Sequence, residues 1–226
     1  MVWSIQQATE WLDGHRSFES SGRFEHKPTS AGVRAILDAL GNPERGYKVI
    51  HITGTNGKGS VTRIASELVS ALGYRVGSFV SPHLHRLNER ILIGNSPVTD
   101  ELLASELFLI AGMEEKLGLN LSWFEVLTVA AFSLFYAEGV EVAVVEVGIG
   151  GTWDSTNVVE ADVAVVASVG HDHLELLGPT LGDVAADKAG IIKEGSVGII
   201  GEVDESLRTI FERRPNAGLL FVGQQR

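Results

Sequence analysis

Apolar residues occur along this chain in two patterns: short continuous runs, and longer stretches with apolar positions three or four residues apart. The continuous runs predict strands at 48–53, 75–80, 142–147, 163–169, 197–200 and 219–222, with a further short strand within 87–93. The spaced stretches predict helices at 4–13, 31–40, 60–72, 100–117, 123–137, 180–189 and 204–214. Because strands and helices alternate, we expect an α/β fold, a mostly parallel sheet flanked by helices.

Local sequence features support several of these boundaries. The motif SWFE at 122–125 has the S-x-x-E pattern of a capping box at the start of the fifth predicted helix. Thr29 or Ser30 can cap the second predicted helix, and GNP at 41–43 ends it. The polar segment 14–28 is typical of a loop. No repeat, low-complexity tract or linker divides the chain.

The stretch HITGTNGKGS at 51–60 joins the first predicted strand to a helix. A strand, a glycine-rich turn and a helix aim backbone N–H groups at an anion, so this loop is expected to bind phosphates. Its candidate nucleotide-binding residues are Gly54, Thr55, Asn56, Gly57, Lys58, Gly59 and Ser60. Ile52 stands where the pattern G-x-x-x-x-G-K-[ST] has its first Gly, and Gly59 separates Lys58 from Ser60. The loop is therefore a variant of that pattern, and an ordinary βα turn is the alternative.

Further polar residues follow the predicted strands, at Ser81, Glu146 and 171–173. The carboxyl ends of parallel strands share one edge of a sheet, so these residues should lie near the phosphate loop. Glu146 stands inside the apolar run VVEVGIGG, where a carboxylate is costly to bury unless a cation or strong donors compensate it. A Mg²⁺ ion on nucleotide phosphates would do so. A Glu that reaches solvent at a strand end is the alternative.

For four further residues, the sequence alone does not decide between a functional and an ordinary structural role. His171, Asp172 and His173 could be metal ligands, acid–base groups or plain loop residues. Lys188, in ADKAGII, has apolar neighbours on a predicted helix. A solvated ammonium on a buried stem is the ordinary role of such a lysine.

Composition narrows the class of protein. The 226 residues, 44% hydrophobic and 21% charged, fit a soluble globular chain of one domain, or one domain and part of another. A net charge of −11 argues against a broad nucleic-acid-binding surface. The absence of Cys excludes disulfides. Neither a secretory signal nor a long apolar run is visible, so we expect a cytoplasmic protein with no membrane partner.

Several motifs together resemble one family. HITGTNGKGS, SPHLHRLNERI, LSWFEVLT, VVEVGIGGTWDSTNVV, HDHLELLG and DKAGIIK occur in that order between about residues 5 and 203. In this respect the chain is similar to the N-terminal part of folylpolyglutamate synthase/dihydrofolate synthase, a branch of the Mur ligase superfamily. The resemblance implies a P-loop NTPase-like central domain.

The resemblance also implies roles for particular residues. The glycine-rich loop would hold the phosphates of ATP, with Lys58 at the transferring end. Ser81 and Glu146 would coordinate Mg²⁺, and His173 would help bind a second Mg²⁺. Lys188 matches a lysine that similar proteins carry in carbamylated form, as an anionic metal ligand. The catalytic residues so implied are Lys58, Glu146, His173 and Lys188.

Other matching stretches imply contacts with the pterin end of the substrate. These candidate residues are Thr29, Ser30, Trp123, Phe124, Trp153 and Asp154. The three aromatic rings could stack on a flat heterocycle, and simple core packing is the alternative.

The implied reaction is ATP-dependent amide ligation. The carboxylate of dihydropteroate or of a folate attacks the γ-phosphoryl group, which gives an acyl phosphate and ADP. The α-amine of L-glutamate then displaces phosphate. The partners would be these small molecules alone, and the protein is expected to be a monomer. Which of the two acceptors is used stays open.

Two features depart from the family pattern. Thr152 stands where many similar proteins have Arg, which puts a substrate contact from this position in doubt. The family also continues into a C-terminal Rossmann-like domain, so we expect 1–226 to be an N-terminal and central ATP-binding domain, incomplete at its C-terminal end. Ligation by this polypeptide alone should be weak or absent. The alternatives are another Mur-type amide ligase, acting on a cell-wall precursor or an amino-acid polymer, and a nucleotide-binding remnant without ligase activity.

Overall fold

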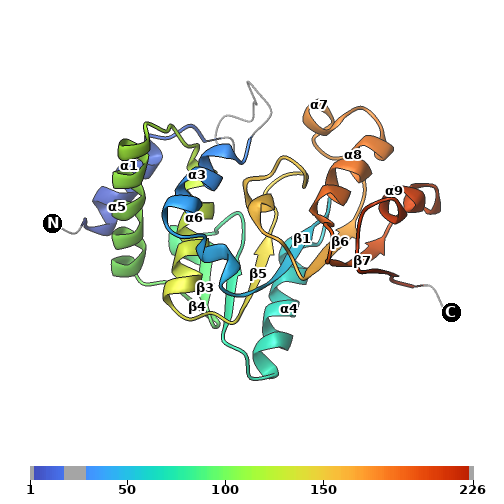
Figure 1. The fold of residues 1–226 in the computed structure, drawn as a ribbon, viewed down its shortest axis with the longest axis horizontal. Coiled ribbons are helices and arrows are strands. Elements are labelled where there is room, and N and C mark those ends of the chain that lie inside the picture. The colour runs from blue at the N-terminus through green and yellow to red at the C-terminus, as the bar shows by residue number, and fades with distance from the viewer. Residues whose placement is uncertain (1–2, 18–28, 224–226) are drawn as a thin grey trace.

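The computed structural model describes residues 3–17 and 29–223. Within these residues, eight strands form one sheet in the order β4-β3-β2-β5-β1-β6-β7-β8 (Figure 1). The strands are β1 Lys48–Thr53, β2 Val76–Phe79, β3 Ile91–Ile93, β4 Ser96–Pro97, β5 Val142–Glu146, β6 Val163–Ser168, β7 Val197–Glu202 and β8 Gly218–Phe221. Neighbours from β2 to β8 pair in parallel, and β3 and β4 add an antiparallel edge. The predicted mostly parallel sheet is confirmed.

The helices agree with the apolar periodicity, with two exceptions. They are α1 Ile5–Asp13, α3 Ala31–Ala39, α4 Lys58–Ala71, α5 Asp100–Leu117, α6 Trp123–Ala137, α7 Leu174–Leu177, α8 Leu181–Lys188 and α9 Arg208–Glu212. The predicted helix at 204–214 is divided into the 3₁₀ turn η5 Glu205–Leu207 and α9. The short α7 was not predicted, because four residues are too few for a periodic signal. Most of the predicted loop at 14–28 lies outside the described residues.

Helix starts follow the expected capping chemistry in one case and depart from it in another. Ser122 and Glu125 form the predicted capping box of α6, and the Glu125 carboxylate accepts from the Ser122 N–H at 2.7 Å. Ser30 occupies the N-cap of α3, but its side chain makes no capping hydrogen bond. The predicted side-chain cap is therefore wrong at Ser30, although the helix begins where it should.

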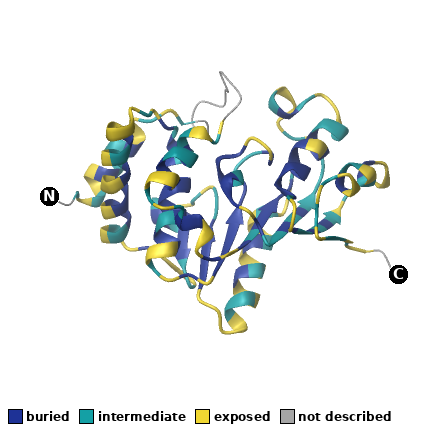
Figure 2. Ribbon diagram, in the orientation of Figure 1, coloured by how far each residue is buried: buried dark blue, intermediate teal, exposed yellow. Residues whose placement is uncertain are grey.

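Helices cover both faces of the sheet. Helices α1, α3, α5 and α6 pack on one face around Phe79, Phe132 and Phe135, and α8 and α9 continue this layer over β6 and β7. Helix α4 packs on the opposite face, against Ile52 and Val144. Figure 2 shows that the central strands are buried between these layers.

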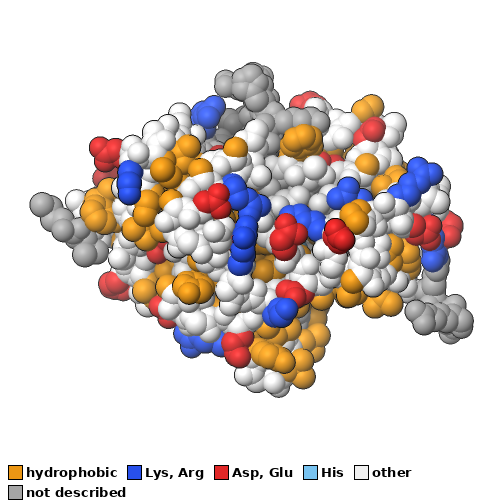
Figure 3. Space-filling view, in the orientation of Figure 1, with side chains coloured by type: hydrophobic (Ala, Val, Ile, Leu, Met, Phe, Trp, Pro, Cys, Tyr) orange, Lys and Arg blue, Asp and Glu red, His pale blue; other side chains and the backbone are white. Residues whose placement is uncertain are grey.

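The outer side of α4 is apolar as well. Ile64 and Leu68 of the helix are 59% and 63% exposed, and Leu72 at its C-cap is 75% exposed. Figure 3 shows hydrophobic side chains gathered over α4 at the lower edge of the molecule. No helix among the described residues is long and apolar enough to span a membrane.

The sheet register brings the strand ends together. Ile52 pairs with Glu146 across β1 and β5, and Phe79 of β2 pairs with Val145. Thr53 pairs with Val166 of β6 on the other side. Because these strands are parallel, the segments that follow them all leave the sheet at the same edge.

Candidate functional site

The loop between β1 and α4 has the shape of an anion-binding turn. Gly57 is the N-cap of α4 and adopts the left-handed conformation, with φ 82°, which a residue with a Cβ adopts only at a cost. Gly54 packs so closely against β6 that a Cβ there would lie 3.0 Å from Ala167. Lys58 folds back over the loop and donates from Nζ to the Gly54 carbonyl at 2.9 Å. The first turn of the 14-residue helix α4 therefore points its N–H groups out of the sheet edge.

Thr55 and Asn56 fasten this loop to the end of β6. The Thr55 N–H donates to the Ser168 carbonyl at 3.0 Å, and its hydroxyl donates to the Gly170 carbonyl at 3.1 Å. The Asn56 N–H donates to the Ser168 hydroxyl, which donates back to the Asn56 carbonyl, both at 3.0 Å. The turn is held rigid, as pre-organised phosphate binding requires.

Glu146 lies directly beside this loop. Its side chain is buried, with the residue 4% exposed, and one oxygen accepts from the Ser81 N–H at 3.2 Å. A Cβ built on Gly59 would lie 3.6 Å from the Glu146 carboxylate. Burial raises the pKa of Glu146, while the Ser81 N–H and the positive charges of Lys58 and Arg90 oppose that rise. The structure thus brings Lys58, Ser81 and Glu146 together.

The residues of this cluster fit a magnesium ion in their chemistry. A buried carboxylate held by a single backbone N–H among the hydrogen bonds of the described residues leaves most of its lone pairs for other ligands. Carboxylate and hydroxyl oxygens are what Mg²⁺ prefers, and it takes its remaining ligands from phosphates and water. No group of three or more His, Asp or Glu side chains within 3–17 and 29–223 is placed to hold a metal ion.

A second cluster connects α8 to the segment after β6. The Lys188 ammonium lies 3.7 Å from one Asp172 oxygen, and the His173 Nε2 lies 3.3 Å from the other. Lys188 is 1% exposed. Burial and, to a smaller extent, the charge of Lys58 lower its pKa to about 8, against the opposing effects of Asp172 and Asp187. Lys58 and Lys188 are thus close enough to repel each other, which favours an anion between them.

His173 has an unusual backbone for its residue type. It is the N-cap of α7 in the left-handed conformation, with φ 42°. Such a conformation at a residue with a Cβ is uncommon and is often found at functional positions. Thr152 is tied to the same region, because its hydroxyl donates to the Asp187 carbonyl at 2.8 Å.

Asp154 lies beneath the glycine-rich loop that follows β5. Its carboxylate is buried and accepts from the Ile149 N–H at 3.0 Å, the Thr156 N–H at 2.9 Å and the Thr156 hydroxyl at 2.5 Å. Burial raises its pKa, and these donors oppose the rise. The Thr156 hydroxyl also bonds to His51 Nε2 at 2.8 Å. In this structure the Asp154 oxygens therefore hold the loop in place.

The candidate aromatic residues differ in exposure. Trp123 is 8% exposed; the Arg90 guanidinium lies 4.6 Å from its ring centroid, and its indole N–H donates to Asp13 at 3.2 Å. Phe124 stacks on Phe79, with ring centroids 5.5 Å apart. Trp153, by contrast, is 43% exposed. Trp123 and Phe124 therefore pack within the fold, and of the three rings Trp153 presents the most open surface. Thr29 is exposed and Ser30 half-buried.

One residue near the site was missed by the sequence analysis. Arg90 is 1% exposed, and its charge acts on Glu146. It is the last residue of the 3₁₀ turn η2 Leu87–Arg90, just before β3. Its only signal in the sequence is a charged residue next to the apolar run ILI, which is common at strand starts.

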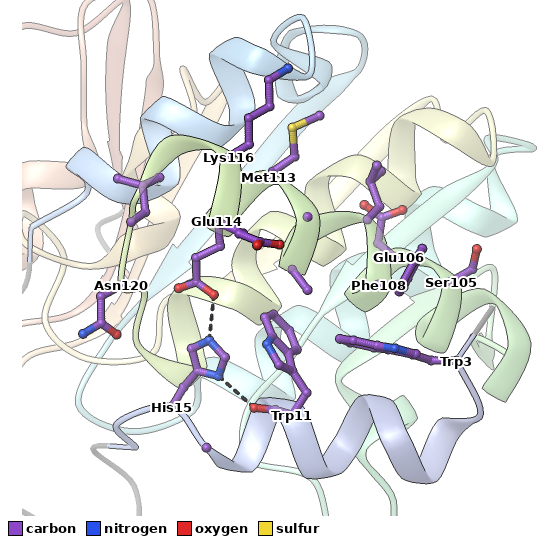
Figure 4. A pocket seen from close by; sticks show the side chains of 16 residues that line it. Trp3, Trp11, His15, Ser105, Glu106, Phe108, Met113, Glu114, Lys116 and Asn120 are labelled. Carbon is purple, nitrogen blue, oxygen red and sulfur yellow. Dashed lines mark hydrogen bonds and ion pairs between the residues drawn. The ribbon is translucent and has the colours of Figure 1, made fainter. Parts of the chain in front are cut away.

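A groove lies away from this site, between α1 and α5 (Figure 4). It has a volume of about 1020 Å³, and Trp3, Trp11 and His15 point into it from the N-terminal segment. The His15 Nε2 lies 3.0 Å from the Glu114 carboxylate of α5. None of the predicted site residues lines this groove.

The parallel sheet and the glycine loop at its carboxyl edge define an α/β domain with the geometry of an anion-binding site at the N-terminus of α4. The model of the Mur ligase middle domain matches residues 52–225. The chain belongs to the Mur ligase family.

The chain is also similar to individual proteins of known sequence and structure. It is 36% identical over 201 residues to the dihydrofolate synthase/folylpolyglutamate synthase of Bacillus subtilis, over 86% of this chain and 45% of that protein. A complex of FPGS with AMPPCP and folate superposes with a TM-score of 0.88 at 32% identity, over 98% of this chain and 55% of that one. E. coli FolC in complex with DHPP and ADP gives 0.84 at 29% identity, over 97% and 51%. The chain thus spans about half the length of these relatives.

Proposed function

We propose that this chain is the ATP- and pterin-binding part of an amide ligase that joins L-glutamate to dihydropteroate, to folylpolyglutamate or to both, through an acyl phosphate. The observation that carries the proposal is the meeting of Lys58, Ser81 and the buried Glu146 at the mouth of the glycine loop. The relatives' names and ligands support it: two solved complexes hold a nucleotide together with folate or DHPP.

In the proposed reaction the chain aligns charges and performs no covalent chemistry. The N-terminus of α4 and the loop at 54–60 bind the phosphates, and Lys58 shields the transferring group. Ser81 and Glu146 would hold Mg²⁺, which when bound would neutralise phosphate charge. The acceptor carboxylate then meets less repulsion when it attacks the γ-phosphorus.

Lys188 and His173 belong to the second part of the proposal. We propose that His173 helps to hold a second Mg²⁺ and that Lys188 is carbamylated. A lysine reacts with CO₂ through its neutral amine, and burial raises the neutral fraction of Lys188 by lowering its pKa to about 8. Native mass spectrometry, with and without added bicarbonate, would show the added CO₂ group and its loss in the variant Lys188→Arg.

The pterin contacts stay predictions. We propose that Thr29, Ser30 and the exposed Trp153 meet the heterocycle, and that Trp123, Phe124 and Asp154 line the same side. The exposure of Trp153 supports the first set. For the second set, packing and loop-holding contacts are the interactions present in this structure. We also propose a monomer with small-molecule partners.

Calorimetric titration of the 226-residue chain with Mg-ATP tests the nucleotide site. We expect Lys58→Met to weaken binding at least about tenfold, since it removes a charge from bound phosphates. The exposed Lys116→Met is the matched control and should bind as the wild type does. Equal binding by both variants would contradict the proposed site.

Phosphate release tests the reaction itself. We would measure release that depends on both L-glutamate and dihydropteroate or folate, for the chain alone and complemented with the C-terminal half of the Bacillus subtilis relative. Release with either acceptor supports the proposal. Release only with a cell-wall precursor, or tight ATP binding without any ligation, would overturn it in favour of another Mur-type ligase or a nucleotide-binding remnant.

A further inference from the structure

The loop between β2 and β3 is folded tightly around one carboxylate. Glu89 accepts hydrogen bonds from the N–H groups of Leu84 at 2.7 Å, Arg86 at 2.9 Å and His85 at 3.1 Å. These donors lower the pKa of Glu89. The loop therefore presents His83, two residues after Ser81, in a fixed position.

The His83 ring has its proton placed by a neighbour. Arg90 donates from Nε to the Nδ1 of His83 at 2.8 Å. A guanidinium N–H can only donate, so the Nδ1 of His83 must accept and carries no proton. The neutral ring then has its proton on Nε2, which makes that nitrogen a donor. Because the bond comes from a cation, it also polarises the ring and strengthens the Nε2–H donor.

Arg90 occupies the boundary between the two halves of the site. Its guanidinium lies over the Trp123 ring, 4.6 Å from the centroid, and the His83 ring stacks on the same Trp123 at 6.4 Å. The Arg90 charge also acts on Glu146, beside the phosphate loop. His83 and Arg90 therefore lie between the residues proposed for the pterin end and those proposed for the phosphates.

We propose that His83 binds the carboxylate of the acceptor acid through its Nε2–H, and that Arg90 is the positioning residue that sets this tautomer. This inference rests on the proposed function. In such a ligase the acceptor must place its carboxylate between the pterin site and the γ-phosphate, because that carboxylate attacks the phosphorus. A polarised N–H donor backed by a buried cation suits an anion at this place. The His83 bond goes to the carboxylate oxygen that does not attack, and orients the other one.

The first experiment measures the tautomer without any ligand. Long-range ¹H–¹⁵N spectra of the wild-type chain should show His83 protonated at Nε2 only. In Arg90→Lys, which keeps the charge but loses the fixed Nε–H, His83 should show a mixture of tautomers. A wild-type His83 protonated at Nδ1 would overturn the inference.

The second experiment measures acceptor binding. With AMPPCP present, His83→Ala should weaken dihydropteroate binding about tenfold, the loss of one charge-assisted hydrogen bond. His83→Gln, which retains an N–H donor, should recover most of it. AMPPCP affinity should not change, nor should the affinity for a pterin that lacks the p-aminobenzoyl carboxylate. The exposed His85→Ala, on the same loop, is the control.

The outcomes separate this inference from the proposed function. If the wild type binds dihydropteroate and His83→Ala binds it equally well, the role of His83 is wrong and the ligase proposal stands. An equal loss for the carboxylate-free pterin would also contradict it, because the effect would then be structural. If the folded wild-type chain binds AMPPCP but no dihydropteroate, the pterin-binding proposal fails, and this inference fails with it.

Discussion

The backbone N–H of Ser81, just beyond β2, donates to the carboxylate of Glu146 at the end of β5, over 3.2 Å. The two strands pair in parallel, so the sheet itself holds this donor and acceptor at one edge. Burial raises the pKa of this carboxylate, and the Ser81 bond opposes that rise without cancelling it. A divalent cation would compensate the charge of that carboxylate. Removing the charge of Glu146 should therefore weaken cation binding without destabilising the fold.

For Glu146→Gln, we expect the free energy of unfolding at pH 7 to rise by up to about 1 kcal/mol, because a neutral amide is less costly to bury. Mg-ATP affinity should fall at least about tenfold, while binding of ATP in EDTA should change little. Denaturant unfolding and calorimetry measure the two effects. The exposed Glu101→Gln is the control. Loss of more than 1 kcal/mol of stability would show that Glu146 has a structural role.

Two glycines of the phosphate loop should respond differently to alanine. Gly57→Ala should lower the free energy of unfolding by about 1 kcal/mol, because its φ of 82° strains a residue with a Cβ. Gly59 is helical, and a Cβ there would meet the Glu146 oxygens at 3.6 and 3.8 Å, ordinary contact distances. Gly59→Ala should therefore raise stability by ~0.5–1 kcal/mol.

The same Gly59→Ala change should weaken Mg-ATP binding, since its methyl group lies against the Glu146 carboxylate where we propose the cation. Thermal unfolding together with Mg-ATP titration of both alanine variants checks this. If the Gly59→Ala chain is more stable and still binds Mg-ATP like the wild type, the cation does not bind at this position.

Lys188 should make stability depend on alkaline pH. Its pKa is lowered from 10.5 to about 8 in the folded chain, so between these values the unfolded state binds more protons. The contribution of Lys188 to the free energy of unfolding therefore becomes more favourable as pH rises through this window. In CO₂-depleted buffer at pH 7, Lys188→Met should be more stable than the wild type by about 1–3 kcal/mol.

This difference should shrink between pH 8 and 10.5, as measured by denaturant unfolding. The exposed Lys116→Met should show no such window. A Lys188→Met chain that is less stable at pH 7 would mean that the ion pair with Asp172 outweighs the burial of the ammonium.

His51 should make stability depend on acidic pH. Its side chain is fully buried in β1, and burial, with the Lys193 charge, lowers its pKa to about 3. Below the ordinary value of 6.5 the unfolded state takes up a proton that the folded state refuses. Stability is thus lost as pH falls from 6.5 toward 3.

Between pH 7 and 5, the wild type should lose about 2 kcal/mol more than His51→Gln, which does not titrate. The exposed His85→Gln should lose as much as the wild type. Equal losses in the wild type and His51→Gln would show that His51 is protonated in the folded state.

Much of the fold is readable in the apolar pattern. The strand Lys48–Thr53 and the helix Asp100–Leu117 have the predicted bounds, and α6 begins at its capping box. These elements are buried on the faces that their periodicity indicates. The pattern does not show strand order: β5 lies between β1 and β2, although it is far from both in the sequence.

The site residues likewise divide into those that the sequence reveals and those that only the packing reveals. The glycine loop and Glu146 stand out in the sequence because their residue types conflict with their apolar surroundings. Arg90 gives no such signal, and its place over Trp123 depends on a turn and a helix more than 30 residues apart. Trp123 and Phe124 could be identified as aromatic, but whether they face a ligand or the core could not be read from periodicity.

By itself the sequence determined the α/β class, most of the element boundaries and the glycine-rich loop between β1 and α4, because these follow from local backbone preferences and short-range apolar spacing. The sequence placed Ser81 and Glu146 at one edge of the sheet, but only the tertiary structure showed the hydrogen bond between them, the repulsion between Lys58 and Lys188, and the bond from Arg90 to His83. Those contacts arise from strand order and burial, which shift pKa values and fix donors only when distant segments pack together.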